Sequence, residues 1–365
     1  MENDLLYQIA LSKIQNIGPV HAKNLVEKFG SAKAIFQAPQ HQLEKLEGIG
    51  LLRAQGIKSI KNFEESEKEI AFIEKFQVTP LFYSSGDYPS NLRNCYDPPV
   101  LLYFKGNISL NDYYFVGIVG TRSNTDYGKY ITRYIIEGLA KENIVVVSGL
   151  ARGIDAIAHQ TALDLNLPTI GVLAHGLDTI YPAHHHQLAR QMINNGGLIT
   201  EFPSTTMAEK HHFPNRNRIV AGLSDVLIVI ETGIKGGSMI TAELAFQYNR
   251  DVFAVPGRLT DKHSAGCHHL IWQNKASVFT TIENFLQDMG WATIKQNQVV
   301  QPGLFLNLTE EEKKIFDLIR EKQPIHIDEL RYHSKLVNSK LSSVLLQLEI
   351  KAAIVAQPGS RYSCL

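Results

Sequence analysis

The sequence predicts an α/β protein built on a parallel sheet covered by helices on both faces, with a helical domain before it and a winged-helix domain after it. Short runs of Val, Ile and Leu alternate with helical segments through the middle of the chain. Glycine-rich or arginine-rich turns follow several of these runs, and both ends of the chain are mainly helical in pattern. Strands without polar alternation are buried on both faces, as in parallel sheets covered by helices.

The first domain, predicted over 1–66, consists of short helices separated by glycine turns. Segments 14–25 and 46–55 resemble each other, and each places an apolar residue and a glycine before a helix start. This pattern is typical of a SAM/helix-hairpin-helix-like domain, whose hairpin amides can hold a phosphate. A bundle whose glycines only turn the chain fits equally well, because Arg53 is the only cation beside the second copy.

The central domain is predicted over 67–290. Two strands, at 79–83 and 98–106, are expected at the edge of the sheet because prolines flank them. From residue 113 strands alternate with helices, so crossovers should be right-handed and ligands should bind at the strand carboxyl ends. The expected strands are 115–119, 144–148, 169–174, 198–201, 226–231, 252–255 and 277–280. The expected helices are 128–141, 154–165, 184–195, 215–222, 238–249, 266–275 and 281–289.

A linker is predicted over 291–306, followed by a winged-helix domain over 307–365. Thr309 and Glu312 form a capping-box pattern at the start of its first helix. The third helix carries Lys340 and Lys351 but many leucines, which is a weak surface for reading DNA. A partner-binding or structural role fits this domain at least as well.

Composition limits the function. The 365-residue chain has a formal net charge of zero, so any affinity for nucleic acid must come from a local patch. No apolar stretch approaches the roughly 20 residues of a membrane helix. Three distant cysteines, Cys95, Cys267 and Cys364, fit a reduced cytoplasmic protein. The paired histidines lack a carboxylate or cysteine to complete a metal set, so no metal is expected.

Common nucleotide motifs are missing from the sequence. The first turn has the wrong glycine spacing for a dinucleotide fingerprint, and the second strand ends in Ser148-Gly149 where that fingerprint needs an acid. No G-x-x-x-x-G-K-[ST] occurs either. No cofactor is therefore expected.

The turns instead suggest a row of phosphate sites. Arg122, beside Gly, Thr and Ser, could fork onto a phosphate, although a carboxylate across the sheet edge is the alternative partner. Phe213, held extended by Pro214, could stack on an unpaired base while Lys210 holds a phosphate. Alternatively Phe213 is a core residue, and Arg216 and Arg218 pair with Asp225 or Glu201. Several anion sites on one sheet edge favour a phosphate polymer over a single nucleotide.

Six segments together resemble the bacterial DNA-processing protein A family (DprA, also called Smf). They are Gly120-Thr-Arg-Ser, Ser148-Gly-Leu-Ala-Arg-Gly-Ile-Asp-Ala-Ile-Ala-His, Gly176-Leu-Asp-Thr-Ile-Tyr-Pro, Phe213-Pro-Asn-Arg-Asn-Arg-Ile-Val-Ala-Gly-Leu-Ser, Gly237-Ser-Met-Ile-Thr-Ala and Val255-Pro-Gly. The resemblance is strong over about 85–280, and the outer domains fit the layout of the family.

The resemblance implies an extended Rossmann-like parallel sheet in the central domain. It also implies a non-enzymatic, dimeric protein that binds single-stranded DNA and loads the RecA recombinase onto it during natural transformation. It implies a dimer and RecA surface around His269, Leu270 and Ile271, where Cys267-His-His departs from the residues usual in the family. The full set of expected DNA-binding residues is Arg122, Ser148, Gly149, Lys210, Phe213, Asn215, Arg216, Asn217, Gly237 and Ser238.

Two other functions compete with this one. A nucleotide phosphoribohydrolase of the lysine-decarboxylase-like type would use a P-G-G-x-G-T-x-x-E segment, and residues 235–243 keep the paired glycines and Glu243. Met239 and Ile240 replace its third glycine and threonine, and such bulk would block a ribose phosphate. A sequence-specific regulator would instead bind duplex DNA through the winged helix.

Overall fold

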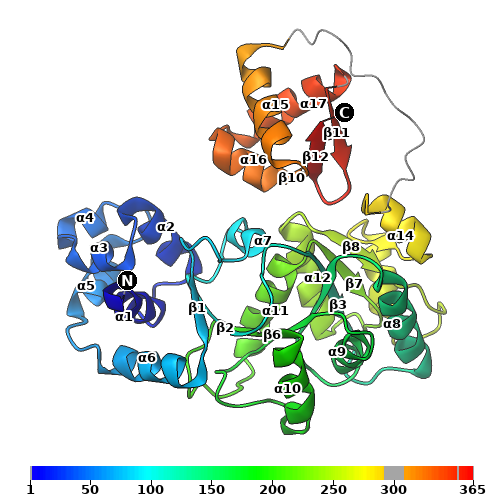
Figure 1. Ribbon diagram of the computed structural model, residues 1–365, viewed down its shortest axis with the longest axis horizontal. Coiled ribbons are helices and arrows are strands. Elements are labelled where there is room, and N and C mark those ends of the chain that lie inside the picture. The colour runs from blue at the N-terminus through cyan, green and yellow to red at the C-terminus, as the bar shows by residue number, and fades with distance from the viewer. Residues whose placement is uncertain (1, 292–307, 352, 365) are drawn as a thin grey trace. The chain divides into compact units, whose positions relative to one another are not determined.

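The computed structural model describes residues 2–291, 308–351 and 353–364, and the chain divides into two compact units (Figure 1). The first unit is Met1–Tyr248 with Val252–Val278, and the second is Asn249–Asp251 with Phe279–Leu365. The predicted linker at 291–306 lies outside the described residues except for Trp291. Trp291 is buried and its ring packs edge-on at 5.8 Å from Phe285, so it belongs to the second unit's core.

Six helices open the first unit, because apolar residues recur at helical spacing and glycines or prolines separate them. Gly48 lies in the turn between the helices at 40–44 and 50–59, and Asn16 lies in the turn between the first two helices. Arg53 donates from Nε to the Asn16 carbonyl and from Nη1 to the Gly48 carbonyl, each at 2.7 Å. The guanidinium thus joins the two hairpin turns, which favours the structural interpretation of this domain. The helices are α1 (Glu2–Ser12), α2 (Pro19–Phe29), α3 (Ala32–Gln37), α4 (Gln40–Glu44), α5 (Gly50–Ser59) and α6 (Glu64–Phe76).

A nine-stranded sheet forms the centre of the first unit, in the order β1-β2-β6-β5-β4-β3-β7-β8-β9. Pairing is antiparallel from β1 through β2 to β6, and parallel from β6 to β7 and between β8 and β9. The strands are β1 (Thr79–Phe82), β2 (Leu101–Gly106), β3 (Tyr114–Val119), β4 (Ile144–Ser148), β5 (Thr169–Val172), β6 (Gly196–Thr200), β7 (Val226–Val229), β8 (Asp251–Ala254) and β9 (Ser277–Val278). Every predicted strand is therefore present.

The prediction that both proline-flanked strands lie at the edge was wrong for β2. That strand pairs with β1 on one side and β6 on the other, and its first four residues are buried. The proline inside a strand, Pro80, lies in β1, where one side of the strand is unpaired.

Helices cover both faces of the sheet. Figure 1 shows α8 (Asp126–Leu139), α9 (Ile154–Asp164) and α10 (His186–Asn194) on one side, with α11 (His212–Leu223) and α12 (Gly237–Gln247) on the other. The chain runs from β3 towards β6 in one direction, and from β7 towards β9 in the other. The strand order therefore reverses between β3 and β7. The remaining helices of this unit are α7 (Ser90–Arg93) and α13 (Ala265–Trp272), with the short 3₁₀ helix η1 (Ala183–His185) before α10.

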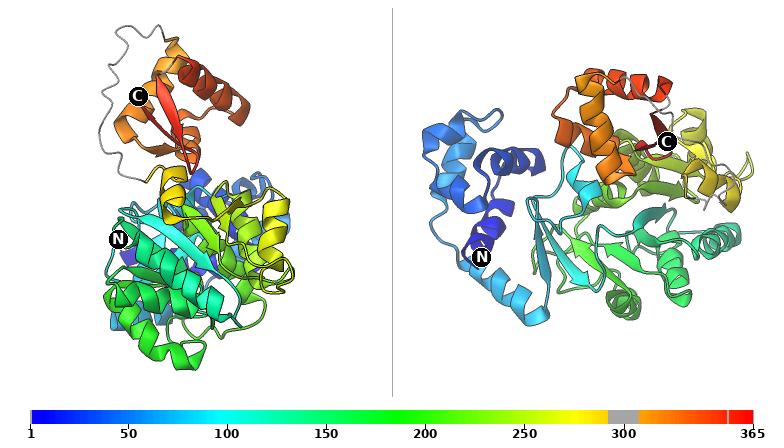
Figure 2. Two further views of the ribbon diagram at one scale, coloured as in Figure 1. Left: turned by 90° about the vertical axis from the view of Figure 1, so that its right-hand side faces the viewer. Right: turned by 45° about the horizontal axis from the view of Figure 1, so that its top comes forward.

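The second unit contains the predicted winged helix, visible in both views of Figure 2. Thr309 and Glu312 form the predicted capping box, and Ile315, Leu341 and Leu348 lie in the core. Lys340 pairs with Glu311, and Lys351 pairs with Glu312 at 2.7 Å, so acids of α15 neutralise both lysines that were candidates for DNA reading. The elements are α14 (Ile282–Asp288), α15 (Glu310–Lys322), β10 (Ile325–His326), α16 (Ile327–Ser334), α17 (Asn338–Ile350), β11 (Ile354–Gln357) and β12 (Arg361–Cys364).

Within the described residues, none of the helices has the length and apolar character needed to cross a membrane. Cys95, Cys267 and Cys364 are free thiols, the first two of them buried.

Candidate nucleic-acid interface

A cavity of about 640 Å³ lies at the carboxyl ends of β3, β4 and β7. The strand order reverses here, and ligands of open α/β sheets bind at such points. All four predicted turns reach this cavity, so the expectation that they share one edge of the sheet is confirmed. We call it the Arg122 cavity; its lining includes Gly120, Thr121, Arg122, Gly149, Asp155, Tyr181, Lys210, Phe213, Arg216, Asn217, Gly237 and Ser238.

Arg122 and Lys210 are the exposed cations of this lining. Neither has a carboxylate partner within the part of the chain that the structure describes. Arg122 therefore does not form the ion pair that was the alternative prediction for it. Cations that are not neutralised at the mouth of a cavity attract and hold anions. The two side chains can therefore engage phosphate.

Phe213 lies in the first turn of α11, and the prediction that it is extended was wrong. Pro214 is tolerated there because N–H groups at a helix start have no intrahelical acceptor. The ring of Phe213 has the Arg122 guanidinium 5.5 Å from its centroid and the Arg216 guanidinium 5.9 Å away. It is half-buried and lines the cavity, so one ring can serve both the fold and a ligand.

Tyr181 is a second aromatic residue of the cavity that was not predicted. The residue is 52% exposed, and its ring lies edge-on to Phe213 with 6.1 Å between centroids. The sequence held one signal, since Tyr181 directly precedes a proline in a turn-rich segment. Two neighbouring rings, one of them open to solvent, form a surface on which unpaired bases can stack.

Arg216 does not have the direct role that was predicted for it. The residue is 5% exposed, and its Nη1 donates to the carbonyl of Gly149 and, at 2.9 Å, to that of Val172. Burial lowers the pKa of Arg216, and the carboxylate of Asp155 opposes this change. The guanidinium is committed to backbone carbonyls, so it supports the floor of the cavity.

The Ser148-Gly149 turn also differs from expectation. Ser148 is fully buried, and its hydroxyl donates to the Ile118 carbonyl at 2.6 Å, so it cannot reach DNA. The amides of Gly149 and Ala151 donate to Asp155 at 3.2 and 3.3 Å. Burial raises the pKa of Asp155, and Arg216 acts in the opposite direction. The anion site expected at this turn is thus filled by the protein's own carboxylate.

The glycine turn before α12 lines the cavity with Gly236, Gly237 and Ser238. Gly237 opens that helix, and the first N–H groups of a helix lack intrahelical partners and favour anions. The Ser238 hydroxyl donates to Thr232 Oγ1 at 2.7 Å, so only its backbone is available. Asn217 donates to the Gly237 carbonyl at 3.4 Å and braces this turn, whereas Asn215 is exposed outside the cavity lining.

Gly237→Ala tests whether a ligand approaches this backbone. A Cβ built on Gly237 meets no atom within 4 Å, so the fold should keep its stability within about 0.5 kcal/mol. The added methyl group would stand where a phosphate approaches the amides, and we expect affinity for single-stranded DNA to fall about tenfold, equivalent to 1.4 kcal/mol. Fluorescence anisotropy and thermal unfolding measure the two effects. Unchanged affinity would remove this turn from the interface.

Arg218 is a scaffold residue, in agreement with the alternative prediction that it pairs with a carboxylate. It is buried and pairs with Glu201, and it also donates to the Asp97 carbonyl. Asp225 has a different function, accepting from the Phe115 amide at 2.8 Å.

The predicted dimer and RecA surface on α13 needs a correction. Leu270 is 1% exposed and packs in the core, so it is not available to a partner, whereas His269 and Ile271 are half-buried. Trp272, which was not predicted, is 76% exposed and its ring lies 5.8 Å from His269. A partner surface on this helix would therefore centre on Trp272.

Acidic side chains are sparse in the described lining of the Arg122 cavity. Among the described lining residues Asp155 is the only acid, and it is already bound by two amides. The described residues contain no cluster of three or more His, Cys, Asp or Glu able to hold a metal ion.

Comparison with known proteins gives three matches to family models. Residues 79–290 match DNA recombination-mediator protein A, 306–360 the DprA winged helix domain, and 9–68 a SAM-like helix-hairpin-helix tandem. Protein Smf of Synechocystis is 34% identical over 98% of both chains. The DNA processing protein DprA of Streptococcus pneumoniae is 42% identical over 59% of this chain and 76% of its own.

Solved structures agree with these matches. The X-ray structure of DprA from Streptococcus pneumoniae superposes with a TM-score of 0.64 at 33% identity, covering 77% of this chain and 96% of that one. The DNA processing protein A of Helicobacter pylori gives a TM-score of 0.53 at 36% identity, covering 58% of this chain and 94% of that one. The latter structure is described as showing a single-stranded DNA binding mode.

Proposed function

Because this chain belongs to the DNA recombination-mediator protein A family (DprA, also called Smf), with a role in DNA processing and recombination, we propose that its Arg122 cavity binds single-stranded DNA without catalysing a reaction. The observation that carries the proposal is the grouping of Arg122, Lys210, Phe213 and Tyr181 around the start of α12. Cations and helix amides hold phosphates, and the rings stack on bases. The single-strand binding described for the Helicobacter pylori relative supports the same function.

Duplex DNA fits this site less well than a single strand. Base stacking on Phe213 and Tyr181 needs bases that are free of their complementary strand. We therefore expect tighter binding of a single-stranded oligonucleotide than of the matching duplex, with little base preference, in a gel-shift competition. Preference for the duplex would contradict the proposal.

Phe213→Ala should weaken single-strand binding by about 1–3 kcal/mol, equal to roughly 5- to 150-fold in Kd, if one stacked base is lost. The dependence of affinity on salt should stay unchanged, because no phosphate contact is removed. Titrations at several salt concentrations measure both quantities. Tyr181→Phe is the matched control, since it keeps the stacking face; a Phe213→Ala variant with wild-type affinity would exclude the ring from the interface.

We further propose that the protein acts in the cytoplasm as a homodimer and loads RecA onto the bound strand. The exposed face of α13, with Trp272 at its centre, is the surface proposed for these contacts. Trp272→Ala should leave single-strand binding intact but reduce RecA assembly on the strand, or dimer formation measured by sedimentation. Unchanged behaviour in both assays would place these contacts elsewhere.

Nucleotide phosphoribohydrolase activity has little support at this site. Glu243, its expected acid, pairs with Lys275 at 2.8 Å and does not line the Arg122 cavity. Ile240 occupies part of the lining. If the wild-type protein released free base from a nucleoside monophosphate and Glu243→Ala did not, this alternative would be supported.

A further inference from the structure

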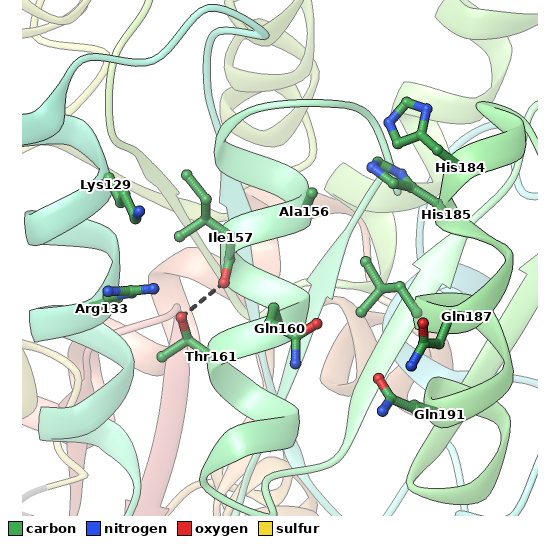
Figure 3. Close-up of a pocket in the computed structure, with 11 residues that line it drawn as sticks. Lys129, Arg133, Ala156, Ile157, Gln160, Thr161, His184, His185, Gln187 and Gln191 are labelled. Carbon is green, nitrogen blue, oxygen red and sulfur yellow. Dashed lines mark hydrogen bonds between the residues drawn. The ribbon is translucent and has the colours of Figure 1, made fainter.

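A second cavity, of about 520 Å³, lies over the first turns of α9 (Figure 3). The outer face of α9 forms its floor, α8 forms one wall, and η1 with α10 forms the other. We call it the α9 groove. None of its residues was singled out by the sequence as a DNA contact.

The charge of the α9 groove is positive. Lys129 and Arg133 lie one turn apart on α8, both are exposed, and Figure 3 shows both side chains directed towards α9. No Asp or Glu belongs to the described lining, and neither cation has an ion-pair partner in the described chain. Burial lowers the pKa of His185, so this side chain adds little to the positive charge of the α8 wall. That wall is suited to phosphate groups.

The opposite wall is suited to bases. Gln187 and Gln191 on α10 face the groove, and their amides have no side-chain partner within the described chain. Gln160 on the floor donates one bond to Asp164 at 2.8 Å and keeps its carbonyl free to accept. Amides that both donate and accept can bond to the edges of bases, while Ile157 supplies apolar surface beneath. A groove that binds nucleotides needs one surface for the phosphate and another for the base, and the two walls of the α9 groove provide them.

Consecutive residues at the start of α9 line the two cavities. Asp155 lines the Arg122 cavity, and Ala156, the next residue, lines the α9 groove. Arg152 is exposed in the turn that precedes α9. The chain that carries Arg122 also runs directly into α8, where Lys129 and Arg133 lie.

We propose that one DNA strand continues from the Arg122 cavity across the start of α9 into the α9 groove. Lys129 and Arg133 hold its phosphates there, and the glutamines face its bases. This inference rests on the proposed single-strand binding function. It extends the path of the strand beyond the Arg122 cavity, and so increases the number of nucleotides held by each protomer.

The test is the affinity for oligothymidines of increasing length, measured for the full chain and for Lys129→Glu/Arg133→Glu. Short oligonucleotides that fill only the Arg122 cavity should bind the variant as they bind wild type. Longer ones should lose at least tenfold in affinity, and the length at which affinity stops rising should become shorter. For long strands, the slope of log affinity against log salt concentration should fall in magnitude by about 1.4, because two phosphate contacts of about 0.7 each are lost.

Lys141→Glu/Arg190→Glu is the matched control, because it changes the net charge equally at exposed residues outside both linings. An equal loss at every length, an equal loss in the control, or no loss at any length would overturn the proposal. So would two short oligonucleotides bound per wild-type protomer, since that result indicates an independent site. If wild type failed to bind the short oligonucleotides at all, the proposed function itself would have failed.

Discussion

Arg122→Glu should weaken binding of single-stranded DNA about 100-fold at moderate salt. The substitution removes a charge-assisted hydrogen bond, worth about 1.5–3 kcal/mol, and places a negative charge against the phosphates. Together these effects reach about 2.7 kcal/mol, which is a factor of 100 in Kd. Arg122 is exposed and has no ion pair among the described residues, so the fold should not change.

Fluorescence anisotropy with a labelled oligonucleotide measures this effect, and thermal unfolding checks that stability is retained. Lys141→Glu, two residues beyond the end of α8, makes the same charge change away from the cavity and should lose less than about twofold in affinity through long-range repulsion alone. Equal losses in both variants would show that net charge, and not contact at Arg122, controls the affinity.

Gly149→Ala should destabilise the fold by about 3–5 kcal/mol, which is the largest stability effect we expect. A Cβ there would lie 2.1 Å from Nη1 of Arg216 and 2.4 Å from its Cζ. The guanidinium cannot move aside, because it is buried and bonded to the carbonyls of Gly149 and Val172. Overpacking and the loss of a buried charged network together give this magnitude.

The urea midpoint of the first unit, followed by far-ultraviolet circular dichroism, tests this expectation. Gly237→Ala serves as its control, because the same added methyl group meets open space there. A Gly149→Ala protein as stable as that control would mean that Arg216 does not support the cavity floor in the way described.

The sheet could be predicted from the sequence because its signal is local. A strand such as 144–148 is apolar on both faces, which requires burial on both faces wherever the strand lies in the sheet. The edge assignment of β2 failed because strand neighbours depend on residues about 95 positions away, such as Thr200 opposite Tyr103. Proline position alone does not determine such pairing.

The cavity could be located from its turns, but the role of each side chain could not. Phe213 showed how a helix start overrides the preference of a residue before proline for extended backbone. Arg216 had a usable signal, since Ile219, Val220 and Leu223 define the inward face of α11 and Arg216 lies one turn earlier on it. Its bond to Gly149 joins residues 67 positions apart, which no local pattern reveals.

Photocrosslinking tests the central claim most directly. A bromouracil-containing oligonucleotide is bound to the wild-type full chain, irradiated, and the attached peptides are identified by mass spectrometry. We expect crosslinks to peptides that carry Phe213 or Tyr181, competed away by unlabelled single strands but poorly by duplex DNA. Crosslinks confined to the winged helix or to the helices before β1, with none at the Arg122 cavity, would contradict the claim that this cavity holds the strand.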